Sequence, residues 1–219
     1  MGVIGECVTP LRVHAALDGP VVIPDGGLYL DSLLIAQVAR ERDLVCLDAT
    51  MLVPLDIPIA MEPDGRFYLC SSGQSVEIEA EMQHTVRRPI VAEAQALAET
   101  KLRRLDITTG ANRAYYMPRP VGYLDSGIVW WCIGEAEEIR RLLSSVTNLG
   151  KRRAVGLGRV DAWTVEPCEP WDGFPVVRDG KPLRRLPIGW PGVEAARCGF
   201  GTIAPPYWDQ TREEPCLIP

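Results

Sequence analysis

Histidine is scarce in this chain, and long hydrophobic segments are missing. Only His14 and His84 occur among the 219 residues, which leaves few side chains that transfer protons near neutral pH. No apolar run comes close to the length of about 20 residues that a membrane-spanning helix needs. The amino terminus also lacks the basic and hydrophobic regions of a signal peptide. We therefore expect a cytoplasmic protein with no membrane partner.

Closely spaced cysteines are missing as well. The seven cysteines are odd in number and scattered, and none lies two to four residues from another, which is the spacing of a zinc site. Cys132 falls within an apolar run and is typical of a small buried side chain. The sequence thus predicts reduced cysteines, no metal site and no bound cofactor.

The motifs of nucleotide-binding loops are also absent. A P-loop needs two glycines five residues apart, followed by Lys and Ser or Thr, between a strand and a helix. The glycine-rich stretch 148–159 does not have this spacing. It follows a predicted helix and precedes a predicted strand, so no helix N-terminus is available to receive a pyrophosphate. We exclude both the P-loop and the glycine-rich dinucleotide-binding motif.

An excess of positive charge is the last absence. The net charge is −6 and the isoelectric point is about 5.1, which argues against a free-standing nucleic-acid-binding protein. Basic residues nevertheless cluster at 87–88, 101–104, 151–153 and 184–185. Because the local sign of charge decides where a polyanion binds, a basic groove remains compatible with an acidic chain.

The pattern of apolar residues predicts alternating strands and helices in the first part of the chain. Residues 8–17 alternate between apolar and polar, as a half-buried strand does. Residues 28–43 have one apolar face and predict a helix, with Asp31 or a neighbour as its cap. Two apolar runs within 57–72 flank the turn sequence Glu-Pro-Asp-Gly and predict a hairpin.

The second part repeats this order after a long excursion. Residues 73–126 are polar and basic along much of their length, with a helix-like segment at 91–105. A buried strand at 127–134 and an amphipathic helix at 135–146 follow, and a strand at 159–167 comes after the glycine-rich loop. This order indicates an α+β fold of ferredoxin-like (RRM-like) type. We expect one domain over 1–219, with an insertion at 73–126 and a turn-rich C-terminal β extension at 168–219 that contains a hairpin with its turn at 179–180.

The glycine-rich basic loop has three interpretations. Gly150 can cap the preceding helix while the adjoining cations Lys151, Arg152 and Arg153 are simply solvated. This does not explain Gly156 and Gly158, because glycine near the start of a strand is typical of close approach by another backbone. In the third interpretation, cations and exposed amides together hold the phosphates of an RNA chain.

Four stretches resemble one family of known proteins. They are "LYLDSLLIAQVA", "TTGANRAYYMP", "GIVWWCIGEAEEIRRLL" and "LGKRRAVGLGRVDAW", within roughly 30–205. Their order, and a glycine-rich loop after the second helix, resemble the type IV branch of the repeat-associated mysterious proteins (RAMPs) of CRISPR systems. The resemblance implies a RAMP core with a thumb-like insertion. It further implies a non-catalytic subunit of a ribonucleoprotein effector complex, which caps the crRNA 5′ handle and contacts the first backbone subunit. The large subunit and, indirectly, target DNA would be further partners.

Candidate RNA-binding residues follow from this reading. In the loop they are Gly150, Lys151, Arg152, Arg153, Gly156, Gly158 and Arg159. In the insertion they are Arg87, Arg88, Lys101, Arg103, Arg104, Arg113, Tyr115 and Tyr116. The arginines would attract phosphates and the tyrosines would stack on splayed bases. The alternatives are a solvated surface for the arginines and packing in the core for the tyrosines.

Two other functions remain open. A metal-independent crRNA-processing endoribonuclease would need proton-transferring groups, for which His14 and His84 are the candidates. A lone strand histidine such as His14 is more typical of a structural role, and His84 lies near cations. A protein-only interaction module would leave the basic loop solvated. We expect a protein that is not an enzyme.

Overall fold

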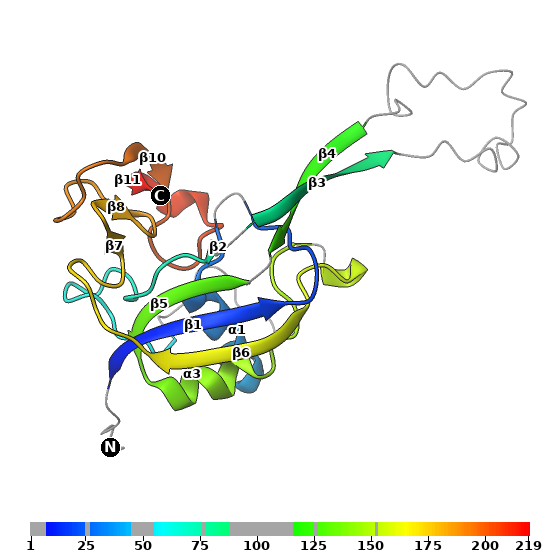
Figure 1. Ribbon diagram of the computed structural model, residues 1–219. Helices are drawn as coiled ribbons and strands as arrows, with labels where there is room; N and C mark the ends of the chain where they lie inside the picture. Colours follow the sequence, from blue (N-terminus) through cyan, green and yellow to red (C-terminus); the bar gives the residue numbers. More distant parts are fainter. Residues whose placement is uncertain are drawn as a thin grey trace, which may run out of the picture.

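The computed structural model describes residues 8–24, 27–44, 55–75, 78–87, 116–124, 127–151 and 153–219. Its centre is a four-stranded antiparallel sheet with the strand order β2-β5-β1-β6 (Figure 1). The strands are β1 (Thr9–Leu17), β2 (Gln74–Ser75), β5 (Ile128–Gly134) and β6 (Val160–Pro167). Two helices and further antiparallel sheets complete the fold, so the predicted α+β class is confirmed.

The alternating pattern of the first strand determines which face of the sheet is buried. Leu11, Val13 and Ala15 of β1 have no exposed surface, whereas the residues between them are partly exposed. Val13 lies opposite Trp130 of β5 and Val165 of β6, both of which are also buried. β1 is thus half-buried, as its alternating sequence predicted, and the structure adds apolar partners on both sides of the buried face.

Both helices pack on this apolar face. α1 (Leu30–Glu41) contributes Leu30, Leu34 and Val38 to the core, and α3 (Ala136–Leu143) contributes a second apolar stripe. Arg141 of α3 joins the helices on their exposed side, because its Nη2 lies 2.9 Å from Glu41 Oε2 and 2.7 Å from Glu138 Oε1. Hydrogen bonds from Arg141 hold the pKa values of Glu41 and Glu138 below their usual range.

The predicted hairpin at 57–72 is confirmed, and one isolated bridge and two backbone hydrogen bonds, Glu62 N to Phe67 O and Leu69 N to Ala60 O, join its arms. Met61 pairs with Tyr68, and Cys70 pairs with Cys132 of β5. The predicted turn closes where Gly65 N donates to Glu62 O at 2.8 Å, and Gly65, the fourth residue of the turn, has positive φ.

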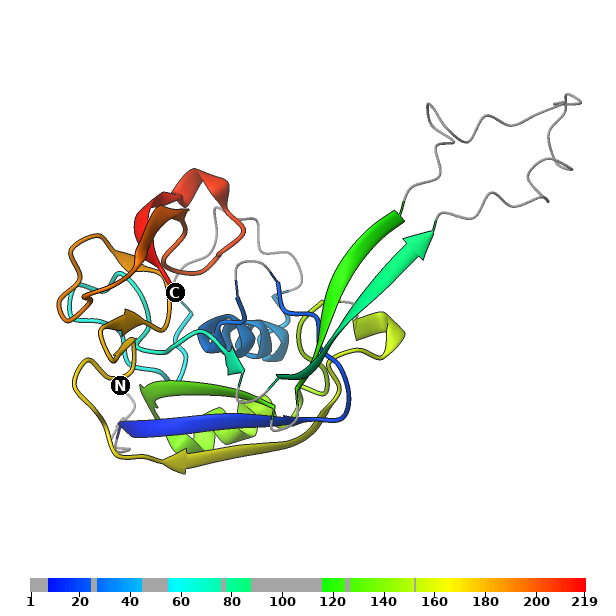
Figure 2. The ribbon, with the colours of Figure 1, turned by 45° about the horizontal axis from the view of Figure 1, so that its top comes forward.

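The long insertion begins and ends as an antiparallel pair. β3 (Ile78–Arg87) and β4 (Tyr116–Leu124) pair with each other and project away from the body (Figures 1 and 2). The helix predicted at 91–105 lies outside the described residues.

The last part of the chain consists of turns and short strands. β7 (Val177–Arg178) and β8 (Lys181–Pro182) form the predicted hairpin, whose turn residues Asp179 and Gly180 both have positive φ. A three-stranded sheet has the order β10-β11-β9. Its strands are β9 (Leu186–Pro187), β10 (Arg197–Gly201) and β11 (Glu214–Ile218). These elements bury their own apolar cluster, which includes Phe67, Leu186 and Cys216.

A buried ion pair attaches this C-terminal part to α1. Arg184 and Asp31 are both fully buried, with Arg184 Nη2 3.6 Å from Asp31 Oδ2. Tyr207 donates to Asp31 at 2.7 Å and accepts from Arg184 at 2.7 Å. Burial raises the pKa of Asp31, although the charge of Arg184 opposes this shift.

This arrangement corrects two readings of the sequence. Asp31 does not cap α1, because the N-cap is Tyr29 and no side-chain hydrogen bond caps the helix. Arg184, counted among the clustered basic residues, adds no charge to the surface because it lies in the interior.

Candidate nucleic-acid interface

The glycine-rich loop connects α3 to β6, and it is not a continuation of the helix. α3 ends at Leu143 with Ser144 as its C-cap, so the interpretation of Gly150 as the helix cap is wrong. Residues 153–155 form a short 3-10 helix, and the chain turns at 156–158 before β6 begins at Val160.

The two ends of the loop are held together by backbone hydrogen bonds. Leu149 N donates to Gly158 O at 2.7 Å, and Val160 N donates to Thr147 O at 2.9 Å. Gly158 has φ +68°, and a Cβ there would lie 2.0 Å from Leu149 O. The prediction of a close backbone approach is therefore confirmed at Gly158. At Gly156, by contrast, a Cβ would meet nothing within 4 Å, so the positive φ of +86° is what favours glycine.

A second contact fixes the loop to the segment after β1. Lys151 N donates to Val22 O, and Gly158 N donates to Pro20 O, both at 2.9 Å. Gly150 has φ +73°, and a Cβ there would lie 2.3 Å from Val22 O. The base of the loop is thus built from two chain segments that lie about 130 residues apart, a separation given by their numbering.

This anchored loop exposes several cationic side chains. The side chains of Lys151, Arg153 and Arg159 are exposed, and Arg152 lies outside the described residues. Arg159 Nη1 is 3.7 Å from Asp18 Oδ2, with the two side chains 69% and 63% exposed. A pair so exposed is weak and screened by salt, and the guanidinium can still attract a phosphate.

The β3–β4 hairpin leaves the body beside this loop, and both views agree on this placement (Figures 1 and 2). Arg87 lies opposite Tyr116 at the far end of the paired strands, and Ile78 lies opposite Leu124 at the near end. The predicted residues Arg87 and Tyr116 thus lie at the opposite end of the paired strands from Ile78 and Leu124.

Most other predicted residues of the insertion lie outside the described residues. These are Arg88, Lys101, Arg103, Arg104, Arg113 and Tyr115. One further cation, Arg119, lies opposite His84 in the β3–β4 ladder. Sequence reasoning missed Arg119, although its place in a polar and basic stretch of the sequence was a usable signal.

The two candidate catalytic histidines lie on different sheets. His14 is on β1, opposite Val129 and Thr164, and is partly exposed on the face away from Val13. His84 is on β3, in the projecting hairpin. The residues that the structure describes contain no group of three or more His, Cys, Asp or Glu side chains placed to hold a metal ion. They also include no helix with the length and apolar character that crossing a membrane requires.

A family model described as CRISPR type IV associated protein Csf3 matches residues 56–219. The chain belongs to the Csf3 family. The match confirms the predicted resemblance to a type IV CRISPR-associated family, and with it a subunit of a CRISPR effector complex. The matched range includes the glycine-rich loop and the β3–β4 hairpin, whereas β1 and α1 precede it. No curated protein matches the chain.

Proposed function

We propose that this Csf3-family subunit binds the crRNA 5′ handle without cleaving it and contacts the first backbone subunit of the complex. The observation that carries the proposal is the loop 148–159, whose base is hydrogen-bonded on two sides and which exposes the side chains of Lys151 and Arg153. A pre-ordered cationic loop loses little conformational entropy when it binds a phosphate chain.

The strand order supports a ferredoxin-like RAMP core for this function. The sequence β1-α1-β2-β5-α3-β6, with the sheet order β2-β5-β1-β6 and all neighbours antiparallel, is that of a split βαβ sheet. In this reading the β3–β4 hairpin is the thumb, inserted between the second and third core strands. A thumb beside the basic loop would hold the handle between them and reach the backbone subunit, with the large subunit and target DNA further away.

The test is to replace Lys151, Arg152 and Arg153 together by Gln. We expect binding of a handle-containing crRNA to fall by at least tenfold, and complex assembly to fall with it. The matched control replaces Arg42, Lys181 and Arg197, which are exposed cations of other segments, and should bind normally. Unchanged binding by the loop variant would contradict the proposal.

The absence of catalysis is tested separately with precursor crRNA. We expect no cleavage by the chain without metal ions. Cleavage that disappears in His14→Ala or His84→Ala would instead support the endoribonuclease alternative.

A further inference from the structure

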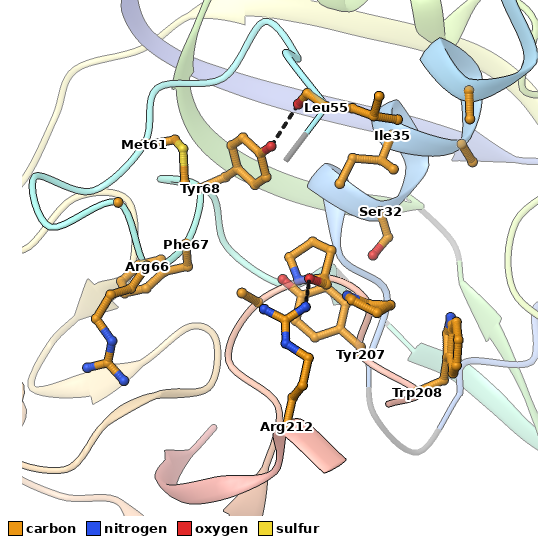
Figure 3. A pocket seen from close by; sticks show the side chains of 16 residues that line it. Ser32, Ile35, Leu55, Met61, Arg66, Phe67, Tyr68, Tyr207, Trp208 and Arg212 are labelled. Atoms are coloured by element: carbon orange, nitrogen blue, oxygen red, sulfur yellow. Dashed lines mark hydrogen bonds between the residues drawn. The ribbon is translucent and has the colours of Figure 1, made fainter. Parts of the chain in front are cut away.

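A cavity of about 560 Å³ lies between α1, the 55–68 segment and the C-terminal segment 204–212. Figure 3 shows Ser32 and Ile35 on the side of α1, Tyr68 across from them, and Tyr207 and Arg212 on the C-terminal side. No residue of the basic loop lines this cavity, so the RNA-binding proposal does not use it.

The described residues that line the cavity have the composition of a protein-interface centre. Large members are Met61, Phe67, Tyr68, Tyr207 and Trp208, and the two charged members are Arg66 and Arg212. Aromatic residues, Met and Arg are enriched at such centres, whereas Lys, Asp, Glu, Ser and Ala are depleted. Lys, Asp and Glu are absent from the lining residues described, whereas Ser32 and three alanines are present.

The floor of the cavity is already ordered. The hydroxyl of Tyr207 bonds to both Asp31 and Arg184, and its ring stacks on Tyr29 with 3.8 Å between centroids. The hydroxyl of Tyr68 donates to Leu55 O at 2.8 Å. A partner would therefore meet a preformed surface, which lowers the entropic cost of binding.

The rim combines exposed apolar surface with an incompletely neutralised cation. Trp208 is 68% exposed and Met61 is 38% exposed. Arg66 is paired with Glu214 at 2.9 Å. Arg212, in contrast, donates to Pro205 O at 2.8 Å and has no ion pair within 4 Å among the described residues. Among the described residues, Arg212 is thus a rim cation with no carboxylate within ion-pair distance, although its charge is felt by the nearby Asp209.

We propose that this cavity docks a segment of another protein subunit of the same effector complex, with an apolar or aromatic anchor side chain flanked by a carboxylate that pairs with Arg212. The anchor enters between α1 and the 55–68 segment and packs against Tyr68 and Tyr207. The inference rests on membership of an effector complex and not on handle binding. RNA fits this surface less well, because a single-stranded RNA site follows the phosphates with several cations.

Two variants test the cavity while leaving the basic loop intact. Ala36→Trp narrows it from an exposed position on α1, and Arg212→Glu reverses the charge at its rim. Each remaining protein subunit of the complex is purified separately and added to the immobilised chain–crRNA complex. We expect both variants to weaken the binding of one and the same subunit by at least tenfold, with the RNA content per chain unchanged.

The controls are Phe200→Ser, which removes a side chain that is 73% exposed, and Arg197→Glu, neither of which lines the cavity. A photo-crosslinker at position 36 should attach to a peptide of that subunit containing an apolar residue next to Asp or Glu. The proposal is wrong if no subunit depends on the cavity, including the case in which none binds the unmodified chain. It is also wrong if crRNA is lost instead, which would assign the cavity to RNA.

Discussion

At the scale of single residues, Gly156 and Gly158 separate two reasons for glycine in one loop. Both have positive φ, but of the two only Gly158 faces a carbonyl oxygen. A Cβ at position 158 would lie 2.0 Å from Leu149 O. Gly156→Ala should cost about 1–2 kcal/mol of stability through its backbone angle alone. Gly158→Ala should cost about 1–3 kcal/mol more, because Leu149 must move away from the new methyl group.

Urea unfolding of the two variants measures this difference. Each acts as the other's control, since the same substitution is made two positions away. Equal losses of stability would mean that the contact between Gly158 and Leu149 does not hold the loop, and that backbone angle alone explains both glycines.

The buried arginine makes a second prediction at this scale. Arg184→Met leaves Asp31 buried without its ion-pair partner, and it should lower the free energy of unfolding by about 3–5 kcal/mol. Adding Asp31→Leu removes the stranded carboxylate, so the double variant should recover much of that loss. Chemical denaturation measures both variants. A single-variant loss below about 1 kcal/mol would show that Arg184 does not stabilise the attachment of the C-terminal part.

At the scale of elements, the connection between α1 and α3 predicts a pH dependence. The pKa values of Glu41 and Glu138 are lowered in the folded protein by hydrogen bonds from Arg141. Their contribution to stability is therefore full above the unfolded pKa of about 4.3 and is lost as pH falls through the lower folded values. Acidification should weaken the contact between the two helices.

Thermal unfolding of Arg141→Met between pH 6 and pH 3 checks this expectation. The variant should be less stable than the unmodified chain at pH 6, and the difference should shrink toward pH 3. Arg40→Met is the matched control, because Arg40 bonds to the amide of Gln37 at 3.5 Å instead of to a carboxylate. A difference that stays constant with pH would contradict the role of these carboxylates.

The elements show which parts of the fold the sequence could predict. Strict alternation in β1 and the apolar stripe of α3 are local patterns, and each predicted its element and its buried face. The Arg184–Asp31 pair was not predictable, because its members lie far apart in the chain and each resembles an ordinary surface or cap residue. The interpretation of Gly150 as a helix cap failed for a similar reason. Its close contact is with Val22, on a segment that only the sheet topology brings near.

At the scale of the whole molecule, the β3–β4 hairpin is separable from the core. Its strands pair with each other and are not part of the central sheet. Replacing residues 78–124 by a short Gly-Ser linker should therefore keep the core folded, with an unfolding free energy within about 1 kcal/mol because loop closure depends weakly on length. The affinity for a handle-containing crRNA should fall at least tenfold.

Circular dichroism and a crRNA binding assay on the same preparation distinguish the two effects. Insertion of a linker of equal composition into the 179–180 turn serves as the control, because that turn lies in the C-terminal part. A variant that unfolds would contradict the separable hairpin, and one that binds RNA normally would contradict its role as a thumb.

The distribution of charge over the whole molecule leads to the last prediction. The chain is acidic overall, with a net charge of −6, so its long-range field does not attract RNA, and binding must depend on local contacts with the phosphates. For a single strand, the logarithm of affinity falls against the logarithm of salt concentration with a slope of about −0.7 per phosphate contact. Replacing Lys151, Arg152 and Arg153 by Gln should therefore make the slope shallower by up to about 2. A variant that makes fewer phosphate contacts releases fewer counterions on binding and must show a shallower slope. If affinity fell and the slope stayed the same, the loop would support RNA binding through its fold and not through its charges.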